Sequence, residues 1–334
     1  MTASLAHLGA REREREGDGD CAALSLLLLL LLLLGMASEL RAVEKDCLGG
    51  GFFGGVGGEL PAAEEIIFGG VQRAVAGDPR MAASLLRLHF HDCFVNGCDG
   101  SVLLDDSPAF AGEKTAGPNA NSLRGFEVVD VSCADILAVA ARDAVALLGG
   151  PTWDAELGRR DSLTASKSAA NKNIPGPNSD LRALVDRFNR LGLSRGTWWP
   201  SQERAVQLVQ LPVEGLPRGG AAVVPGAGEV GFLDSLQQLC DGGNSTALAH
   251  LDLVTPVAFD NQYYTNLLNG VGLLSSDQVL VAGGDGQVLA IVEDYAADPM
   301  AFFQDFKAAM VKMGRLRAPA GAAGEVRRNC RVVN

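Results

Sequence analysis

The chain has 334 residues, a net charge of −12 and a pI near 4.8, and 47% of its residues are hydrophobic. This acidity argues against binding to nucleic acid or to an anionic membrane surface, because both carry negative charge. With 6% aromatic residues the chain also lacks a stacking platform for bases. The length allows one large domain or two small ones with a substantial core, and small-molecule chemistry is the better default.

Residues 1–37 are predicted to be a signal peptide. Ala22–Met36 is apolar and holds nine consecutive leucines, but it is too short for a comfortable bilayer span, so no stable membrane insertion is expected. The mixed charges of Arg11–Asp20 are atypical of a leader. Secretion is still favoured over a cytosolic start. Residues 38–60 are then a glycine-rich N-terminal loop without a period.

Cysteine usage agrees with secretion. Cys21 lies inside the predicted leader, and the six cysteines after it read as disulfide partners in a secreted chain, with those of Cys47 and Cys240 left open. Asn244-Ser245-Thr246 is one possible glycosylation site, although so short a motif matches often by chance.

Apolar spacing predicts a mostly α-helical chain. Helices are expected over Ala62–Val75, from Met81 through the following stretch, over Ser132–Leu148, over Asn178–Leu191 and over Met300–Met313. The helix at Ser132 has a pair resembling a capping box, Ser132 with Asp135, and Gly149-Gly150-Pro151 ends it.

The densest chemistry lies in Leu85–Ser101, which reads LLRLHFHDCFVNGCDGS. On a helix, Arg87 and His91 lie one turn apart on one face, and His89 points elsewhere. On a strand, His89 and His91 would share a face as a zinc half-site, but a zinc hydrolase needs a third ligand, and no histidine lies nearby. Helical spacing after Asp78-Pro79 favours the helix. A surface arginine with a core histidine is the plainer interpretation.

This stretch resembles the distal-heme helix of the secreted plant peroxidases (class III) almost residue for residue. The resemblance covers roughly Pro61–Asn334, apart from two interruptions, and implies a mostly α, heme-peroxidase-like fold of two halves that enclose a heme pocket. Residues 61–334 would be the peroxidase domain, with the distal half mainly in 61–150 and the proximal half mainly in 178–320. It also implies heme b, secretion and a monomeric oxidoreductase that reduces hydrogen peroxide while oxidising phenolic donors, with a role in hydrogen peroxide catabolism and oxidative stress.

The resemblance also assigns roles. His91 would move the peroxide proton, Arg87 would stabilise the charge that develops as the O–O bond breaks, and Asn119 would bind His91. The remaining assignments come by position alone: Phe90 for heme contact, Asp277 for the proximal histidine, and Pro175 for the mouth of the access channel.

Two calcium sites and two disulfides are implied in the same way. The first calcium site would comprise Asp92, Val95 and Gly97 (both by backbone oxygen), Asp99 and Ser101, with Glu113 acting through water; most of the second would comprise Asp252, Thr255, Ala258 (backbone) and Asp260. Hard cations of this kind need several oxygen ligands. A solvated acidic loop is the alternative for the first site. The implied disulfides are Cys93–Cys98 and Cys133–Cys330.

Two departures from the family stand out. Between Phe126–Asp130 and Cys133, about a dozen residues of helix are missing relative to the family, and one of them is a cysteine. The cysteine that pairs with it in the family is replaced by Leu60 in this chain, so both halves of one disulfide are absent. The proximal histidine is also missing, since no histidine occurs between His91 and His250, and His250 is a poor substitute. The segment 197–231 is atypical and rich in proline and glycine.

Two explanations of this segment are open. Trp198-Trp199 fixes the codons TGGTGG, and the codons around it, read one base out of frame, can spell Asp-Met-Val-Ala-Leu-Ser-Gly-Ala, which resembles the family's lead-in to its proximal histidine. A lineage-specific insertion is the alternative. Because the chain as written lacks the axial histidine, there is an alternative function: a non-catalytic, calcium-binding, disulfide-stapled secreted protein, or a defective gene product that lacks the proximal heme ligand.

Overall fold

The computed structural model of the chain describes residues 60–129, 133–193, 211–212, 248–318 and 321–334, together with Phe232, Asp234, Leu236 and Gln238. Contacts divide the chain into two units, Met1–Pro61 and Ala62–Asn334. The predicted leader, the glycine-rich loop and nearly all of segment 197–231 lie outside the described residues. Among the described helices, none combines the length and apolar composition that crossing a membrane requires.

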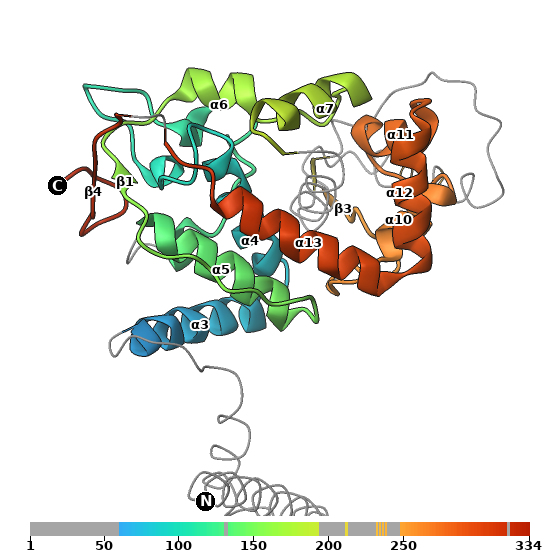
Figure 1. Cartoon of the computed structure of the whole chain (residues 1–334), viewed down its shortest axis with the longest axis horizontal. Helices are drawn as coiled ribbons and strands as arrows, with labels where there is room; N and C mark the ends of the chain where they lie inside the picture. The colour runs from blue at the N-terminus through green and yellow to red at the C-terminus, as the bar shows by residue number, and fades with distance from the viewer. Residues whose placement is uncertain are drawn as a thin grey trace, which may run out of the picture. The chain divides into compact units, whose positions relative to one another are not determined.

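The described part of the second unit is mostly α-helical, as predicted (Figure 1). Its helices are α3 (Leu60–Gly77), α4 (Met81–Cys93), α5 (Cys133–Leu147), α6 (Lys167–Asn173), α7 (Leu181–Arg190), α10 (Gln262–Leu268), α11 (Ser275–Ala282), α12 (Gly286–Ala297) and α13 (Pro299–Gly314). Short 3-10 turns lie at Ser101–Leu103, Glu113–Thr115 and Phe126–Val128.

Local capping explains where the predicted helices begin. The helix expected from Asn178 begins at Leu181, because the Asp180 carboxylate accepts a hydrogen bond from the Ala183 backbone N–H at 2.7 Å. Likewise α13 begins after Asp298, whose carboxylate caps two backbone N–H groups. Ser132, the expected cap of α5, lies outside the described residues.

One apolar cluster joins the helices of the N-terminal part of this unit. Side chains of α3, α4 and α5 meet there, among them Val71, Leu88 and Leu137. Every residue of α4 is buried, so this helix lies inside the fold with its polar side chains. The Arg142 guanidinium connects α5 to α3 by a 2.9 Å ion pair with Glu64.

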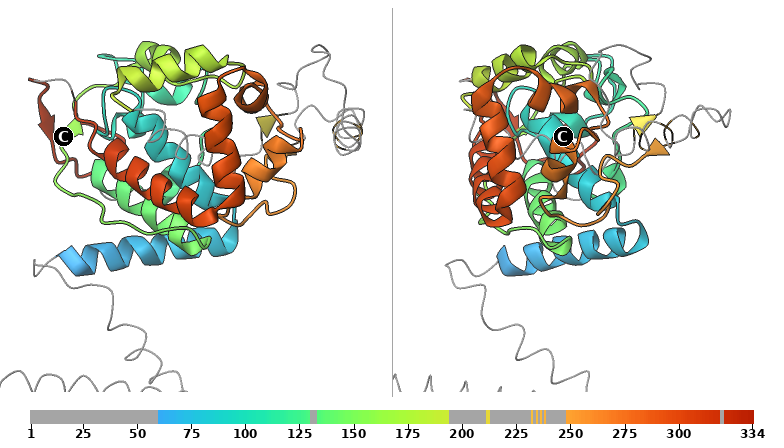
Figure 2. Two further views of the ribbon diagram at one scale, coloured as in Figure 1. Left: turned by 45° about the vertical axis from the view of Figure 1, so that its right-hand side comes forward. Right: turned by 90° about the vertical axis from the view of Figure 1, so that its right-hand side faces the viewer.

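A second cluster, rich in aromatic rings, occupies the C-terminal part. Phe259, Tyr264, Phe302 and Phe306 pack with ring centroids 4.7 to 5.9 Å apart. Helix α13 carries two of these rings and also packs against α4, as the two views of Figure 2 show. Helix α4 therefore packs against both α5 and α13.

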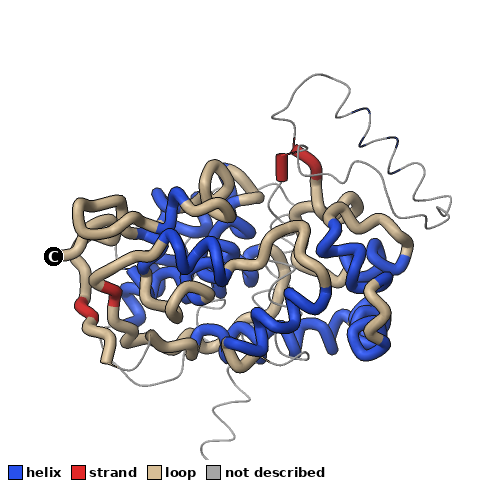
Figure 3. Tube along the Cα trace, turned by 90° about the horizontal axis from the view of Figure 1, so that it is seen from above, coloured by secondary structure: helices blue, strands red, loops and turns tan. Residues whose placement is uncertain are grey.

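Two short antiparallel strand pairs complete the described fold (Figure 3). β1 (Asp161–Ser162) pairs with β4 (Gly324–Glu325), and β2 (Leu211–Pro212) pairs with β3 (Leu248–Ala249). Beyond β4, the Arg327 guanidinium donates to the carbonyls of Gly100 (2.6 Å) and Cys330 (2.7 Å), while Asp161 accepts from the backbone N–H of Arg327. Residues 324–330 thus lie against the loop that follows α4.

Candidate active site and metal-binding loops

Arg87 and His91 lie one turn apart on α4 and touch directly. Arg87 Nε donates to His91 Nε2 at 3.1 Å. The other ring nitrogen, His91 Nδ1, is 2.6 Å from Asn119 Oδ1. Because a guanidinium can only donate, His91 Nε2 must accept, and the ring proton is on Nδ1. The structure therefore assigns the His91 tautomer and brings together all three predicted catalytic residues.

The loop after Glu113 supports both partners. Asn119 Nδ2 donates to the Glu113 carbonyl at 2.9 Å, which turns its Oδ1 toward His91. The Arg87 guanidinium also donates to the carbonyls of Ser122 (3.2 Å) and Pro118 (3.0 Å) and to Ser122 Oγ (3.1 Å). The sequence interpretation missed Ser122, because no local spacing rule pairs this serine with Arg87, 35 residues earlier.

Burial shapes the electrostatics of this cluster. Arg87 is 7% exposed and His91 3% exposed. Burial lowers the pKa of Arg87 to about 10, and burial followed by the Arg87 charge holds the pKa of His91 well below its ordinary value. The imidazole is therefore neutral at physiological pH, with Nε2 as its basic atom.

Phe90 packs beside this cluster in the aromatic core. Its ring meets Phe94 at 4.0 Å and Phe188 of α7 at 6.2 Å between centroids, and it lies edge-on to His91. Pro175 is half-buried in the turn between α6 and α7. The carbonyl of the preceding Ile174 accepts a hydrogen bond from Arg187 at 2.7 Å, which fixes the entry to that turn.

The loop after α4 gathers the first predicted set of calcium ligands. Asp92, Asp99, Ser101 and Glu113 are all buried. Ser101 Oγ and Glu113 Oε2 make no hydrogen bond to any described residue. Gly97 has φ of 98°, and a Cβ there would lie 2.5 Å from the Arg317 carbonyl carbon, so the loop can close only with glycine.

The charges of this loop call for a cation. Burial is the main cause that raises the pKa of Asp92, Asp99 and Glu113, in the last case to about 8, and repulsion from Asp99 adds to the rise at Asp92 and Glu113. Three buried carboxyl groups together with two buried oxygen atoms that lack partners suit a hard divalent ion. The residues present therefore fit calcium.

In the second predicted set of calcium ligands, the carboxylates already accept hydrogen bonds from neighbouring protein groups. Asp252 Oδ1 accepts from the Val254 N–H (2.9 Å) and from Asn266 Nδ2 (3.1 Å), while Asp252 Oδ2 accepts from Thr255 Oγ1 (3.1 Å). Asp260 Oδ1 accepts from the Gln262 N–H, and the half-buried Ala258 precedes it. Since Thr255 is already used as a donor to Asp252, this loop fits a cation less well than the first.

The predicted proximal carboxylate has different partners from those expected. Asp277 Oδ1 accepts from the Tyr263 hydroxyl at 3.0 Å and Oδ2 from the Leu274 N–H at 2.7 Å, and burial raises the pKa of Asp277 to about 6. Residues 92–249 contain no histidine, and His250 is exposed. The residues present therefore do not supply an axial imidazole for heme. Tyr263 was not foreseen.

The four cysteines in the described part of the chain fall into two states. Cys93 and Cys98 form the expected disulfide. Cys133 and Cys330 are two buried thiols in the structure, so the implied bridge is not present. A hydrogen bond between the two thiols, followed by burial, raises the pKa of Cys133. The two sulfur atoms are close enough to interact, and closure of this bridge under oxidising conditions stays a prediction.

The helical fold, the Arg-x-x-x-His pair on a buried helix and the asparagine that holds the histidine match the arrangement expected for the heme-dependent peroxidases, apart from the missing axial histidine. The sequence profile of the family "Peroxidase" matches residues 68–196 and 225–298. The chain belongs to the family of plant secretory peroxidases. The match is interrupted over 197–224, inside the segment identified as atypical from the sequence.

Named relatives agree with this assignment. The chain is similar to Peroxidase 40 of Arabidopsis thaliana, with 51% identity over 303 residues that cover 84% of this chain and 85% of the relative. It is 44% identical to Peroxidase 9 of the same plant, covering 82% and 84% of the two chains. It is 46% identical to Peroxidase 4 of Vitis vinifera, covering 82% and 89%.

Proposed function

We propose that the chain acts on hydrogen peroxide as a heme-dependent peroxidase, with small phenolic molecules as electron donors, and that it works as a secreted monomer. The observation that carries the proposal is the state of His91. Asn119 fixes its proton on Nδ1, and Nε2 is the basic atom beside a buried guanidinium. A peroxidase needs this pairing of a proton acceptor with a fixed positive charge.

His91 and Arg87 perform the proton and charge steps. His91 Nε2 accepts the proton of hydrogen peroxide and returns it to the departing oxygen, so one imidazole serves as base and then as acid. Arg87 must first turn away from Nε2, since its Nε occupies that position. Its guanidinium then stabilises the negative charge on the departing oxygen. Heme, when bound, supplies the redox chemistry, and donors would approach it near Pro175.

The proximal side sets a limit on this function. Asp277 is bonded to Tyr263 and Leu274, and the chain has no histidine to place between this carboxylate and an iron. An axial histidine makes the iron of such enzymes reactive. The chain therefore has the His91 and Arg87 side chains for the proton and charge steps, but it lacks the axial histidine that would bind the iron.

Calcium is the second cofactor of the proposal. Asp92, Asp99, Ser101 and Glu113 would bind it with the backbone oxygens of Val95 and Gly97. The Ser101 Oγ and Glu113 Oε2 atoms, buried without hydrogen bonds to described residues, support this site. Asp252, Thr255, Ala258 and Asp260 would form a weaker second site.

The missing histidine favours a second candidate, a non-catalytic calcium-binding secreted protein stapled by its disulfides. Titration of the purified chain with hemin separates the two candidates. A peroxidase gives a saturable Soret band and peroxide-dependent phenol oxidation. That oxidation is lost in His91→Ala and retained in the exposed control His250→Ala. A chain that binds calcium but neither binds hemin nor oxidises phenols establishes the second candidate and refutes the first.

A further inference from the structure

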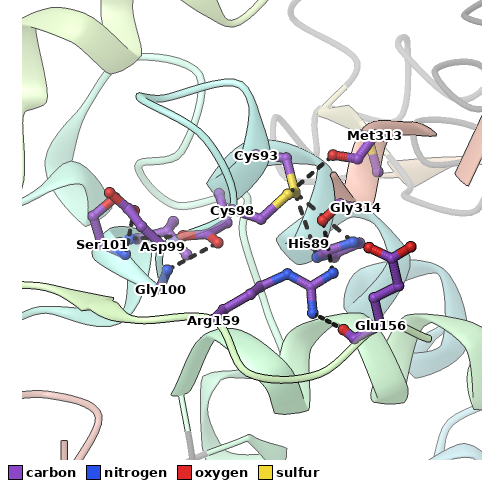
Figure 4. Close-up of a disulfide and its surroundings, with 12 residues drawn as sticks. His89, Cys93, Cys98, Asp99, Gly100, Ser101, Glu156, Arg159, Met313 and Gly314 are labelled. Carbon is purple, nitrogen blue, oxygen red and sulfur yellow. Dashed lines mark hydrogen bonds between the residues drawn. A yellow bond between two sulfur atoms is a disulfide. The ribbon is translucent and has the colours of Figure 1, made fainter. Parts of the chain in front are cut away.

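His89 lies on a different face of α4 from His91 and contacts the disulfide. The His89 side chain is buried, with Nδ1 3.6 Å and Nε2 3.8 Å from Cys93 Sγ, one helical turn along. Figure 4 shows this ring next to the bridge, with the Arg159 side chain beside it. The proposed peroxidase function uses neither His89 nor this contact.

Three potential ligand atoms converge at this point. One nitrogen of His89 and the sulfur atoms of Cys93 and Cys98 all lie within 4.8 Å of one another, and all three residues are buried. An imidazole with two thiolates is a donor set that Zn²⁺ prefers over the hard cations of the neighbouring loop. In the oxidised chain the two sulfurs are bonded to each other, so this donor set is masked.

We propose that reduction of the Cys93–Cys98 bridge creates a zinc site formed by His89, Cys93 and Cys98. A dithiol reduces the bridge by exchange: the dithiol becomes a disulfide, and the two protein sulfurs become thiols. Binding of Zn²⁺ then releases the two thiol protons to solvent and forms two zinc–sulfur bonds and one zinc–nitrogen bond. The site goes beyond the proposed peroxidase function, because it needs neither heme nor peroxide.

The surroundings suit a buried zinc–thiolate group. One Zn²⁺ with two thiolates and a neutral imidazole has no net charge, so burying it avoids the cost of an isolated ion. His89 is available as a neutral ligand because burial, and then the Arg159 charge, lower its pKa. Arg159 is 8% exposed and donates to the Gly314 carbonyl at 2.7 Å, while its Nε makes no hydrogen bond to any described residue. This cation favours thiolates nearby.

Space for a fourth ligand lies alongside. A small pocket is lined by His89, Trp153, Glu156, Arg159, Met310 and Gly314. Zinc with three protein ligands takes a water or a further donor at its fourth position, and such a donor would approach from the imidazole side, because His89 lines this pocket and neither sulfur does. The site would exist in the newly made chain before its bridge closes, and in any reducing compartment.

Cobalt replaces zinc as a coloured probe. The protein to test is the full chain with its five other cysteines changed to serine or alanine, leaving Cys93 and Cys98, before and after reduction with a water-soluble phosphine. The phosphine takes up one oxygen from water as it gives two electrons to the disulfide. We expect the reduced chain to bind Co²⁺ with thiolate charge-transfer bands and intense tetrahedral absorption. The oxidised chain should show neither.

A histidine variant tests the assignment of the imidazole. His89→Gln should weaken Co²⁺ binding by at least about tenfold, whereas His250→Gln should leave it unchanged. A reduced chain with only the weak octahedral spectrum, or equal affinities for His89→Gln and the parent, would overturn the proposal. If His89→Gln does not fold, ¹⁵N-histidine labelling of the parent chain decides. The zinc-dependent shift must then fall on His89, and a shift on any other histidine refutes the site.

Discussion

Two hydrogen bonds determine the chemical state of His91. Asn119 accepts at Nδ1 and Arg87 donates to Nε2, so the two ring nitrogens have opposite roles. We predict that the neutral imidazole carries its proton on Nδ1 at pH 7. The ¹⁵N chemical shifts of the ring in histidine-labelled protein measure this directly. A protonated Nε2 in the ligand-free chain would contradict the geometry.

Removing the Asn119 amide should destabilise the whole chain. Asn119→Ala leaves the buried His91 Nδ1–H without its partner, whereas the Glu113 carbonyl keeps the hydrogen bond from the Ala116 N–H at 2.9 Å. Leaving one buried group unsatisfied costs about 1–3 kcal/mol of unfolding free energy. Urea unfolding measures the loss, and the exposed control Asn178→Ala should change the value by less than about 0.5 kcal/mol. An equally small loss for Asn119→Ala would mean that the loop relaxes to give His91 another partner.

For single residues, the sequence predicted where side chains lie on a helix better than it predicted their hydrogen-bond partners. The spacing of Arg87 and His91 was sufficient to place them on one helical face, because helix geometry is local. Asn119 could be paired with His91 only through the family resemblance, since the two residues come together across a loop. No local rule connects Tyr263 with Asp277, and that hydrogen bond emerged only in the structure.

Among the elements, the loop from Asp92 to Glu113 has the clearest dependence on conditions. The pKa of Glu113 is about 8 in the fold and 4.5 for the free side chain. Between these values the folded chain holds a proton that the unfolded chain has lost. Unfolding free energy therefore falls as pH rises from 4.5 to 8, by an upper limit of about 5 kcal/mol from this group.

Calcium should abolish this trend. We expect a sample with a chelator to lose unfolding free energy between pH 5 and pH 8, because folding raises the pKa of Glu113. A calcium-loaded sample should keep its unfolding free energy, because Ca²⁺ replaces the proton as the counter-charge. Urea midpoints against pH, with calcium or with a chelator, measure the difference. Glu113→Gln should flatten the chelated curve. Identical curves with and without calcium would argue for a simple acidic loop.

Five of the nine described helices were predicted from the sequence, whereas α6, α10, α11 and α12 were not. Apolar stripes around Val71, Leu88 and Phe188 indicated α3, α4 and α7, because a buried stripe is visible in the sequence. The start of α7 at Leu181 depended on the Asp180 cap, and several residues nearby could have served. Such choices depend on small energy differences that spacing alone does not reveal.

For the whole molecule, the Cys133–Cys330 pair is the main undecided link. Both thiols are buried, and a bridge between them would close a loop of nearly 200 residues. Chain entropy predicts a gain of about 5 kcal/mol in unfolding free energy on oxidation, less any strain. Urea unfolding of oxidised and reduced samples measures it. Because reduction also opens Cys93–Cys98, Cys133→Ser/Cys330→Ser should lower the difference to the part that this second bridge contributes. An unchanged difference in the variant would show that Cys133 and Cys330 do not form a bridge.

The global fold was predictable as a class but not in its details. Predominantly helical structure followed from periodicity, and the two halves followed from the family resemblance. Helices α4 and α5 pack against each other, although the family resemblance implies that about a dozen residues are missing before Cys133. Segment 197–231 shows no apolar periodicity, and the family profile does not match it over 197–224. The structure of this segment therefore could not be predicted from either periodicity or family resemblance.

The contact between Arg327 and the Gly100 carbonyl joins positions 227 residues apart. Translation makes the loop after α4 early and residues 324–330 last, so the growing chain carries that loop for most of its synthesis without the Arg327 contact. The contact can therefore form only when synthesis is nearly finished. A premature stop before Gly324 would leave α4 complete but remove the hydrogen bonds that Arg327 and Arg331 make to this loop. The loop would then be held by its nearer contacts alone, among them the Cys93–Cys98 disulfide.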